Sequence, residues 1–316
     1  MKIAFLADPL SGFVTYKDTT YAMIVEAGRR GHEVYALEHR HLSFAGGKVV
    51  GNAARVILTG DATDWYRLEE RVERGLETFD VVVERTDPPF DMEYIYATYL
   101  LELAQARGAR IVNRPEAVRG NNEKLAIMQF PDLIPPTLVT SDAALVRAFH
   151  AEHKDIILKP LDGMGGTGIF RVRADGLNLG SIIETLSDHG RRTIMVQRFI
   201  PEITAGDKRI ILIDGQVVPY CLARIPQGDE VRGNLAAGGL GVTQPISERD
   251  REIAETVGPV LAQRGLLLVG LDVIGNHMTE INVTSPTCFQ EIRQQAGFDV
   301  AAMFVDALER QVQASQ

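Results

Sequence analysis

The sequence predicts an α/β protein in which a doubly wound parallel sheet is followed by two smaller lobes of mixed helix and strand. Apolar strand-like and amphipathic helix-like segments alternate over the first 113 residues. Around Asn121 the pattern changes to short strands, helices and glycine-containing turns, and a glycine-rich stretch, DIILKPLDGMGGTGIF, occupies residues 155–170. We therefore expect an N-terminal domain over residues 1–122, a small lobe over 123–200 and a C-terminal lobe over 201–316.

Individual elements follow from hydrophobic periodicity and from helix stop signals. Apolar runs predict strands at 2–7, 32–37, 80–85 and 110–113. Amphipathic patterns predict helices at 19–30, 93–107, from about Pro115, 142–153, 178–189 and 248–264. Gly31 and Gly108 end the first two helices, and the strand–helix–strand order favours a parallel sheet.

Composition narrows the class of partner. The 316 residues are 45% hydrophobic and 24% charged, which is ordinary for a globular enzyme. A formal charge of −9 argues against nucleic acid or an anionic membrane as the main partner. Cys221 and Cys288, without paired spacing, fit a reducing cytosol and exclude a cysteine zinc site. Because the longest apolar run is too short to span a bilayer, we expect a cytoplasmic protein.

The glycine-rich stretch predicts a phosphate-covering hairpin tip. Its glycines at 163, 165, 166 and 168 let backbone amides approach an anion. Gly168 is followed by Ile169, so the stretch is not a P-loop, and GIFRVRA alternates like a strand instead of opening a helix. Lys159, at the end of the preceding strand, completes the predicted clamp. The alternative is a flexible turn with no ligand.

A second stretch, LLLVGLDVIGNHMTEINVTSPT, predicts a carboxylate-bearing hairpin. If the turn takes residues 275–277, Asp272 lies opposite Glu280, and Asn282 lies on the same face. A two-residue turn would place Asp272 on the other face. Two carboxylates and an amide suit magnesium that bridges nucleotide phosphates. The alternative is a polar, solvated face of the hairpin.

Scattered cations lie between these two stretches. Taken singly, each is a solvated surface charge: Lys124, Lys208, Arg209, Arg224 and Arg232. Together they favour a phosphate site. The segments KRIILID and VPYCLARI alternate as strands around an Asp-Gly turn, so they can direct Arg209 and Arg224 toward one phosphate. The RGNLAAGG segment is a candidate lid. MVQRFIP, at 195–201, is a candidate linker for an adenine edge.

These motifs, in this order, resemble the ATP-grasp ligases. The segments TDPPFD, IYATYLLE, ILKPLDGMGG, VPYCLARIPQG, RGNLAAGG and EINVTSPT resemble the bacterial glutathione synthetase family over essentially the full chain. The resemblance implies three lobes, with ATP held between two antiparallel sheets. It also implies ligation of γ-glutamylcysteine to glycine, with two Mg²⁺ ions (Mn²⁺ as a substitute) and a homotetramer.

The resemblance also implies roles for individual residues. Nucleotide-contacting residues would be Lys124, Lys159, Lys208, Gly163, Met164, Gly165, Gly166, Thr167, Gly168, Gln197, Arg198, Phe199 and Ile200. Magnesium ligands would be Asp272, Glu280 and Asn282, and the reacting carboxyl and phosphoryl groups would meet Arg209, Arg224, Arg232 and Asn234. Lys17, Asp18, Thr19 and Thr20 would border the dipeptide. Arg198 departs from the smaller polar residue expected there, and a mainly backbone contact would tolerate it.

Three rival functions remain open from the residues alone. One is a ligase of other amino acids, such as a D-alanine dipeptide ligase or a glutamate-adding enzyme, although TDPPFD, CLARIPQG and NVTSPT favour the glutathione enzyme. Another is a nucleotide-sensing binding protein, against which the intact carboxylates argue. A kinase lacks its signatures here. The helix EYIYATYLLELA fits a subunit interface as well as a core.

Overall fold

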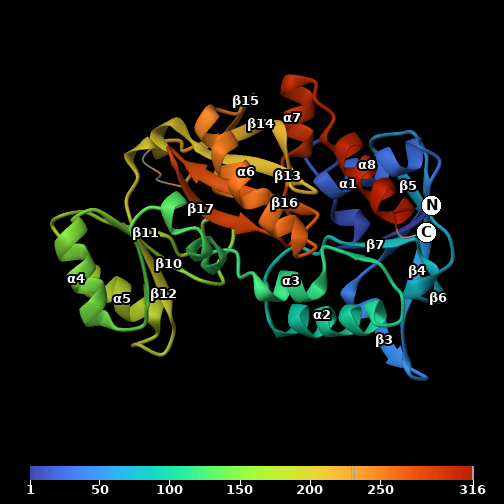
Figure 1. The fold of residues 1–316 in the computed structure, drawn as a ribbon, viewed down its shortest axis with the longest axis horizontal. Helices are drawn as coiled ribbons and strands as arrows, with labels where there is room; N and C mark the ends of the chain where they lie inside the picture. The colour runs from blue at the N-terminus through green and yellow to red at the C-terminus, as the bar shows by residue number, and fades with distance from the viewer. Residues whose placement is uncertain (229, 231, 315–316) are drawn as a thin grey trace.

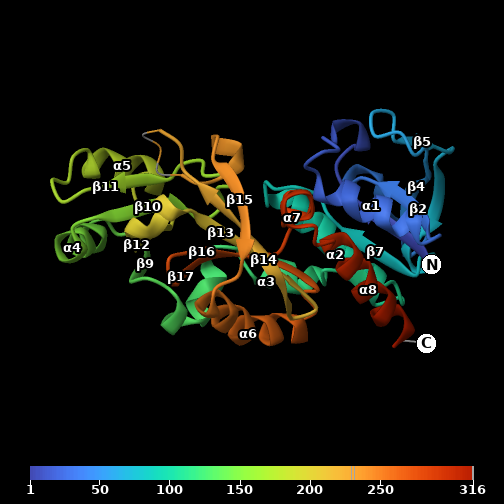
Figure 2. The same ribbon diagram turned by 90° about the horizontal axis from the view of Figure 1, so that it is seen from above.

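The computed structural model describes residues 1–228, 230 and 232–314, and within these ranges the chain forms three sheets. Figures 1 and 2 show the N-terminal domain at one end, the C-terminal sheet in the middle and a small lobe at the other end. Short 3₁₀ turns connect the elements at Leu10–Gly12, His39–His41, Leu76–Thr78, Leu125–Gln129, Pro131–Leu133, Pro201–Ala205 and Leu235–Ala237. In the part of the chain described, no helix combines the length and apolar character needed to cross a membrane.

The N-terminal sheet confirms the predicted parallel arrangement. Strand β1 pairs in parallel with β2 and β7, and β7 pairs in parallel with β8. These strands are β1 (Lys2–Leu6), β2 (Glu33–Leu37), β7 (Val81–Glu84) and β8 (Ile111–Val112). The accompanying helices are α1 (Thr19–Arg29), α2 (Met92–Gln105) and α3 (Pro115–Gly120). Asp18 and Asp91 start α1 and α2 by accepting hydrogen bonds from the backbone amides three residues on.

An antiparallel extension of this sheet was not predicted from the sequence. It consists of β3 (Leu42–Ala45), β4 (Lys48–Leu58), β5 (Tyr66–Leu68) and β6 (Val72–Gly75). Strand β4 is buried without a clean two-residue alternation, so the usual strand signal is weak. Gly51 lies within it because a Cβ at that position would come within 2.6 Å of Leu37 Cδ1.

The small lobe is a four-stranded antiparallel sheet with the order β11-β10-β12-β9. Its elements are β9 (Thr137–Thr140), α4 (Ala143–His153), β10 (Ile156–Pro160), β11 (Phe170–Val172), α5 (Leu179–Ser187) and β12 (Ile194–Arg198). Ile156 pairs with Val172 and Leu158 with Phe170. The glycine-rich loop therefore lies at the tip of a hairpin, as predicted.

The C-terminal sheet has five strands and is antiparallel, with the order β15-β14-β13-β16-β17. Its elements are β13 (Asp207–Ile213), β14 (Gln216–Ile225), β15 (Leu240–Pro245), α6 (Glu248–Gln263), β16 (Leu268–Ile274) and β17 (His277–Asn282). Helices α7 (Phe289–Ala296) and α8 (Val300–Gln313) follow and were not predicted. A signal for α8 existed, because Asp299 caps it through Ala302 N and Val300, Phe304 and Leu308 form an apolar face.

Helix α8 returns to the N-terminal domain and packs beside α1 (Figure 1). Arg30 joins the two helices through Glu26, Asp306 and Glu309, and its guanidinium donates to Ala302 O at 3.0 Å. Hydrogen bonds from Arg29, reinforced by Arg30, lower the pKa of the Glu26 carboxyl to about 2, although burial opposes the shift. This carboxylate holds Arg30, the residue that joins α1 to α8.

Replacing Glu26 by glutamine is expected to lower the free energy of unfolding by about 2 kcal/mol near neutral pH, because a buried charged acceptor is lost. Folding depresses the pKa of Glu26 from 4.5 to about 2. The stabilisation is therefore complete above the unfolded value and disappears as the pH falls through the folded value. Urea unfolding of both proteins at a series of pH values measures the gap.

The matched control is Glu69→Gln, because Glu69 is exposed and its carboxylate lies 3.9 Å from Arg55 Nη1. This control should change stability by less than about 0.5 kcal/mol. A Glu26→Gln gap that stays constant down to the lowest pH would contradict this role for the ion pair.

Candidate active site

One cavity gathers most of the residues predicted to bind the nucleotide. It lies between the small lobe and the C-terminal sheet, and it is also lined by Arg232, Asn234, Asp272 and Glu280. The predicted nucleotide residues that line it are Lys124, Lys159, Gly163, Met164, Gly165, Gly166, Thr167, Gln197, Arg198, Phe199 and Ile200. Gly168 and Lys208 are not among the lining residues. Lys208 contacts Asp250 of α6 and Gly275 O instead, on the opposite face of β13.

A second cavity adjoins the first. Arg209, Arg224, Asn282 and Cys288 line it, together with residues from the N-terminal domain such as Asp87. Four residues belong to the walls of both cavities: Met164, Gly165, Asn234 and Glu280. The predicted phosphate and carboxyl sites therefore share a boundary.

The glycine-rich loop needs its glycines for close approach. Gly165, Gly166 and Gly168 have positive φ values of 60°, 83° and 73°. A Cβ at Gly166 would lie 2.8 Å from Asn234 Oδ1 and 3.0 Å from Arg232 Cδ. Arg232 Nη1 also donates to Gly166 O at 3.3 Å. The predicted lid thus lies directly against the glycine-rich loop.

Two buried lysines extend into the same cavity. Lys159 Nζ donates to Thr279 O at 3.3 Å, and Lys124 Nζ lies 2.8 Å from Glu280 Oε1. Burial lowers the pKa of Lys159, and the charge of Glu280 opposes this only in part. Burial acts in the same direction on Lys124, but its direct contact with Glu280 outweighs it and raises the pKa. Unlike Lys124, Lys159 has no direct carboxylate partner in the described residues. Its buried ammonium group could therefore be paired by an anionic ligand.

Asp272 pairs with Glu280 as predicted, but the turn of this hairpin differs from the predicted one. The prediction of a three-residue turn is wrong, because Ile274 pairs with His277 and the turn holds only two residues. A bulge at Thr279 inserts one extra residue in β17, so that Asp272 still pairs with Glu280 and Gly270 with Asn282. The bulge also presents Thr279 O to Lys159.

Asp272 is held by two arginines. Arg209 Nε and Nη2 donate to its two oxygens at 2.6 and 3.1 Å, and Arg224 Nη2 lies 2.9 Å from Oδ2. Burial alone would raise the pKa of Asp272, but the two arginine charges outweigh it and hold the pKa well below the usual range. Asp272 is therefore an anion at neutral pH.

Asp207 is a site residue that the sequence reasoning missed. Arg224 donates to its Oδ2, while its Oδ1 is buried without a hydrogen-bond partner in the described residues. Burial raises the pKa of this carboxyl, and the charge of Asp272 adds to the effect, against Arg224 and Arg209. The available signal was its position two residues before Arg209 on the same strand, which places both on one face.

Asp272, Glu280 and Asn282 lie on one face of β16 and β17 and carry the oxygen donors that magnesium prefers. Arg209 and Arg224 hold the two oxygens of Asp272, so a magnesium ion would share this carboxylate with both guanidinium groups. Among the described residues, no group of three or more His, Cys, Asp or Glu side chains is placed to hold a metal alone. Oxygen atoms from the nucleotide would have to contribute.

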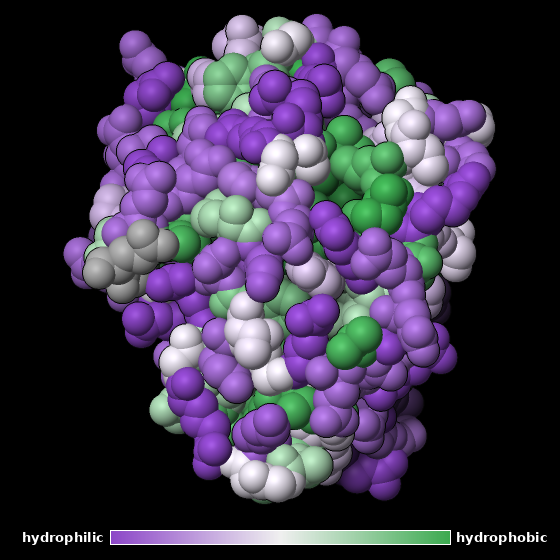
Figure 3. Space-filling model, turned by 90° about the vertical axis from the view of Figure 1, so that its right-hand side faces the viewer, coloured by the Kyte–Doolittle hydropathy of each residue, from purple (hydrophilic) through white to green (hydrophobic). Residues whose placement is uncertain are grey.

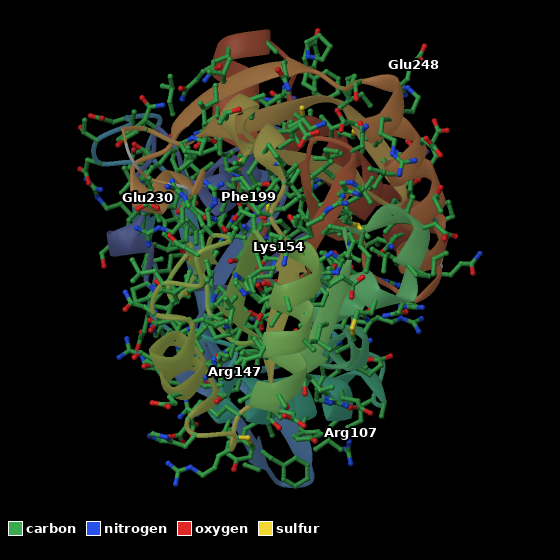
Figure 4. The ribbon with its side chains drawn as sticks, turned by 90° about the vertical axis from the view of Figure 1, so that its left-hand side faces the viewer. Arg107, Arg147, Lys154, Phe199, Glu230 and Glu248 are labelled. Carbon is green, nitrogen blue, oxygen red and sulfur yellow. The ribbon has the colours of Figure 1, made fainter. Side chains whose placement is uncertain are left out.

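Contacts within the small lobe hold the predicted adenine linker in place. Arg171 lies 3.5 Å over the Phe199 ring and is bidentate with Asp155 at 2.9 and 2.6 Å. The amides of Arg198 and Phe199 donate to Pro136 O and Asp155 O, so these two amides face the protein. Phe199, labelled in Figure 4, lines the cavity between the small lobe and the C-terminal sheet. The Arg198 side chain is exposed, and its role at the adenine stays a prediction.

The segment predicted to border the dipeptide lies at the start of α1. Thr19 Oγ1 accepts from Phe289 N at 3.3 Å, and Thr20 Oγ1 accepts from Arg85 Nε at 3.0 Å, whereas Lys17 is exposed. Arg85 was missed by the sequence reasoning. It is buried at the carboxyl end of β7, and its Nη1 lacks a partner in the described residues. In parallel sheets, ligands bind at such strand ends.

Comparison with known proteins covers nearly the whole chain. Residues 1–119 match the family model described as prokaryotic glutathione synthetase, N-terminal domain, and residues 123–297 match prokaryotic glutathione synthetase, ATP-grasp domain. The glutathione synthetase of Ralstonia nicotianae is 59% identical over 310 residues, 98% of this chain and 96% of the relative. That of Neisseria meningitidis serogroup A is 57% identical over 312 residues, 98% of each chain.

Solved structures of low identity share the fold. D-cycloserine synthetase DcsG has a TM-score of 0.68 at 16% identity, over 99% of this chain and 100% of that chain. The ATP-grasp ligase PsnB, complexed with a minimal precursor, Mg and ADP, has a TM-score of 0.63 at 19% identity, over 99% and 98%. At these identities the likeness concerns the fold alone.

Replacing Asp272 by asparagine is expected to lower the free energy of unfolding of the ligand-free chain by about 3 kcal/mol, because two buried arginines lose a shared counter-charge. The matched control is Asp188→Asn, which removes an exposed ion pair with Arg191 and should cost less than about 1 kcal/mol. Equilibrium urea unfolding measures both variants. Equal losses in the two variants would refute a structural role for the buried network.

Proposed function

The chain belongs to the prokaryotic glutathione synthetase family, with both of that family's domains matched, and from this premise we propose how its residues carry out the reaction. It is an ATP-dependent carbon–nitrogen ligase with an ATP-grasp fold, and it synthesises glutathione. The observation that carries the residue-level proposal is the wall shared by the two adjoining cavities. A phosphoryl group in one cavity can meet a carboxylate in the other across that boundary.

The proposed chemistry activates the cysteinyl carboxylate of γ-glutamylcysteine, because a carboxylate is a poor electrophile. A carboxylate oxygen attacks the γ-phosphorus of ATP in line, and the bond from that phosphorus to the bridging oxygen of the β-phosphate breaks. The products of this step are an acyl phosphate and ADP. The glycine amine then attacks the acyl carbon, the ammonium loses its proton, and inorganic phosphate leaves with the electron pair of the broken bond. The side chains position and stabilise, and neither cysteine is needed as a nucleophile.

Two groups of cations would share the electrostatic work. Lys124 and Lys159 line the nucleotide cavity and would neutralise the phosphate oxygens. Arg209 and Arg224 line the second cavity and would face the reacting carboxyl, with Arg224 stabilising the tetrahedral oxyanion. Their ion pairs with Asp272 hold both guanidinium groups in place before substrate arrives.

Magnesium is proposed at Asp272, Glu280 and Asn282, which would hold two ions (or Mn²⁺), and the ions would supply positive charge that offsets the charge of the nucleotide phosphates. The chain's own part is to supply oxygen ligands from two neighbouring strands whose register a bulge fixes.

Water exclusion is proposed for the glycine-rich loop and the segment 232–239. Arg232 and Asn234 already contact Gly166, so the two segments can close as one cover. A cover of this kind would protect the acyl phosphate from hydrolysis.

Several broader expectations are also proposed. We place the lobe boundaries at residues 122 and 200, with a substrate domain, a small ATP-grasp lobe and a C-terminal lobe that holds the metal. A cytoplasmic location is supported by two buried, unpaired cysteines. A homo-oligomer, of four chains by family resemblance, is proposed without any nucleic-acid or membrane partner.

Phosphate release from ATP and magnesium tests the substrates. The expected result is release that requires both γ-glutamylcysteine and glycine, with glutathione formed in equal amount. Release only with another amino acid pair would keep the ligase chemistry and discard these substrates. Tight ATP binding without release for any pair would favour a nucleotide sensor.

Replacing Glu280 by glutamine is expected to lower turnover by on the order of 10²-fold, because a metal ligand and the partner of Lys124 are changed together. Glu248→Gln, at the exposed start of α6 (Figure 4), is the control and should leave turnover unchanged. The measurement is the initial rate of each variant and of the unaltered protein at saturating magnesium. Near-normal turnover of the Glu280 variant would remove this residue from the site.

Replacing Gly166 by alanine is expected to lower kcat/KM for ATP about tenfold or more, because the new methyl group would collide with Asn234 and strain a positive φ. Gly46→Ala is the matched control, since Gly46 also has a positive φ, of 58°, but has open space around it. Steady-state kinetics with varied ATP compare the two. An equal effect from both substitutions would show that backbone strain, and not the contact between the loops, is responsible.

A further inference from the structure

Residues 282–285, the 282–285 segment, leave β17 and form part of the wall of the second cavity. Asn282, Thr284 and Ser285 line that cavity, and Val283 between them is buried. Pairing of β17 with β16 ends at Asn282, so the peptide groups beyond it need other hydrogen-bond partners. Those partners determine where this part of the wall stands.

Glu123 holds the nitrogen side of the segment. Its Oε1 accepts hydrogen bonds from Val283 N at 2.9 Å, Thr284 N at 3.1 Å and Thr284 Oγ1 at 2.9 Å. Its backbone oxygen accepts another from Ile281 N at 2.9 Å. Because one carboxylate oxygen binds two consecutive amides, it fixes the direction in which the chain leaves β17.

Asn113 holds the carbonyl side of the same segment. Its Nδ2 donates to Val283 O at 2.9 Å and to Leu268 O at 2.8 Å, and its Oδ1 accepts from Leu268 N at 3.0 Å. Asn113 is buried, so losing its side chain would leave these backbone groups without partners. Both backbone polar groups of Val283 are therefore bound by side chains that lie far from it in the sequence.

The two side chains come from either side of α3, on the connection from the N-terminal domain to the small lobe. Figure 1 shows α3 between α2 and the C-terminal sheet. The outer end of the N-terminal domain, which faces the viewer in Figure 3, is mostly hydrophilic, and the contacts with the 282–285 segment are made at the inner end. Asp87 of the same domain adds one more, because it accepts a hydrogen bond from Ser285 Oγ.

We propose that Asn113 and Glu123 are positioning residues for the ligation, because they fix the 282–285 segment relative to the nucleotide cavity. Neither residue is among those that line the nucleotide cavity or the second cavity, so each acts through the segment. Glu123 is followed directly by Lys124, whose Nζ lies 2.8 Å from Glu280 Oε1 in the nucleotide cavity. Two consecutive residues thus hold a wall of each cavity. The inference rests on the proposed function in that the second cavity takes the reacting carboxyl group.

The reaction is sensitive to the position of this wall. Transfer between two cavities requires reacting atoms about 3–3.5 Å apart, and a displacement of about 1 Å can cost about 10²-fold in rate. Side chains that orient a ligating group from behind typically contribute about 10–100-fold to affinity or activity. Asn282 is joined directly to Val283, so a segment released at Val283 would shift a proposed metal ligand together with Thr284 and Ser285.

Substitutions at Glu123 separate the position of its oxygen from its charge. Glu123→Asp keeps the charge but withdraws the oxygen by one methylene group, and kcat/KM for γ-glutamylcysteine is expected to fall about 10–100-fold. Glu123→Gln keeps an acceptor oxygen in place and should retain most of the activity. The Kd of ADP, measured by calorimetry without magnesium, should be unchanged in both. Unaltered kinetics for Glu123→Asp, or a Glu123→Gln variant that is equally impaired, overturns the proposal.

The matched control is Asn121→Ala. Asn121 is buried on the same connection, but it donates to Ala117 O at 2.7 Å and accepts from Arg264 Nη1 at 3.1 Å instead of holding the 282–285 segment. This control should lose stability in urea unfolding and keep the kcat and KM of the unaltered protein. An equal loss of kcat/KM in Asn121→Ala would assign the effect to general destabilisation and contradict the proposal.

Coupling between the two residues gives a second test. Asn113→Ala and Glu123→Asp each release one side of Val283, so the loss of kcat/KM in the double variant should be smaller than the product of the two single losses. Losses that multiply would contradict action through one shared segment.

Amide hydrogen exchange tests the same contacts without any substrate. The amides of Val283 and Thr284 should exchange faster in Glu123→Asp than in Asn121→Ala, and equal exchange in the two variants overturns the proposal. Glutathione formation by the unaltered protein is measured in the kinetic assays, so failure of this inference is distinct from failure of the proposed function.

Discussion

The site depends on keeping buried charges paired where the lobes meet. Arg209, Arg224, Asp207 and Asp272 lie on one face of three neighbouring strands, because cross-strand partners share a face. Removing a charge from this group leaves another buried without compensation, which costs several kcal/mol. The packing around the group follows from this need. A Cβ at Gly270 would come within 2.9 Å of Arg209 Cδ, so glycine there makes room for the guanidinium group.

The same ion pairs stabilise the C-terminal sheet and suit the proposed catalytic role of Arg209 and Arg224. The arginines are held by carboxylates in the same sheet, so they need not be ordered by substrate, which is the condition for electrostatic preorganisation. Lys159 differs, because it is buried near a backbone carbonyl and its pKa is lowered by burial. An arriving polyphosphate would supply the missing counter-charge.

The elements with strong local signals were predictable, whereas features set by long-range contacts were not. The parallel strands and the glycine hairpin could be read from periodicity and turn chemistry. The pairing of Asp272 with Glu280 was expected from a three-residue turn that the structure does not have, and a bulge at Thr279, which has no local signature, restores it. Arg85 and Asp207 were missed because their importance arises from burial beside distant segments. Lys208 illustrates the converse: its neighbour Arg209 enters the site, while alternation along β13 directs Lys208 to Asp250.

The central claim is that a carboxylate held in one cavity is phosphorylated by ATP held in the other. Oxygen transfer tests it most directly. With ¹⁸O in the cysteinyl carboxylate of γ-glutamylcysteine, an acyl phosphate predicts one labelled oxygen in the inorganic phosphate for each glutathione formed. Unlabelled phosphate together with stoichiometric glutathione, or label recovered in AMP, would contradict the account. Either result would mean that the carboxyl group is activated by a route other than the phosphoryl transfer that the two adjoining cavities suggest.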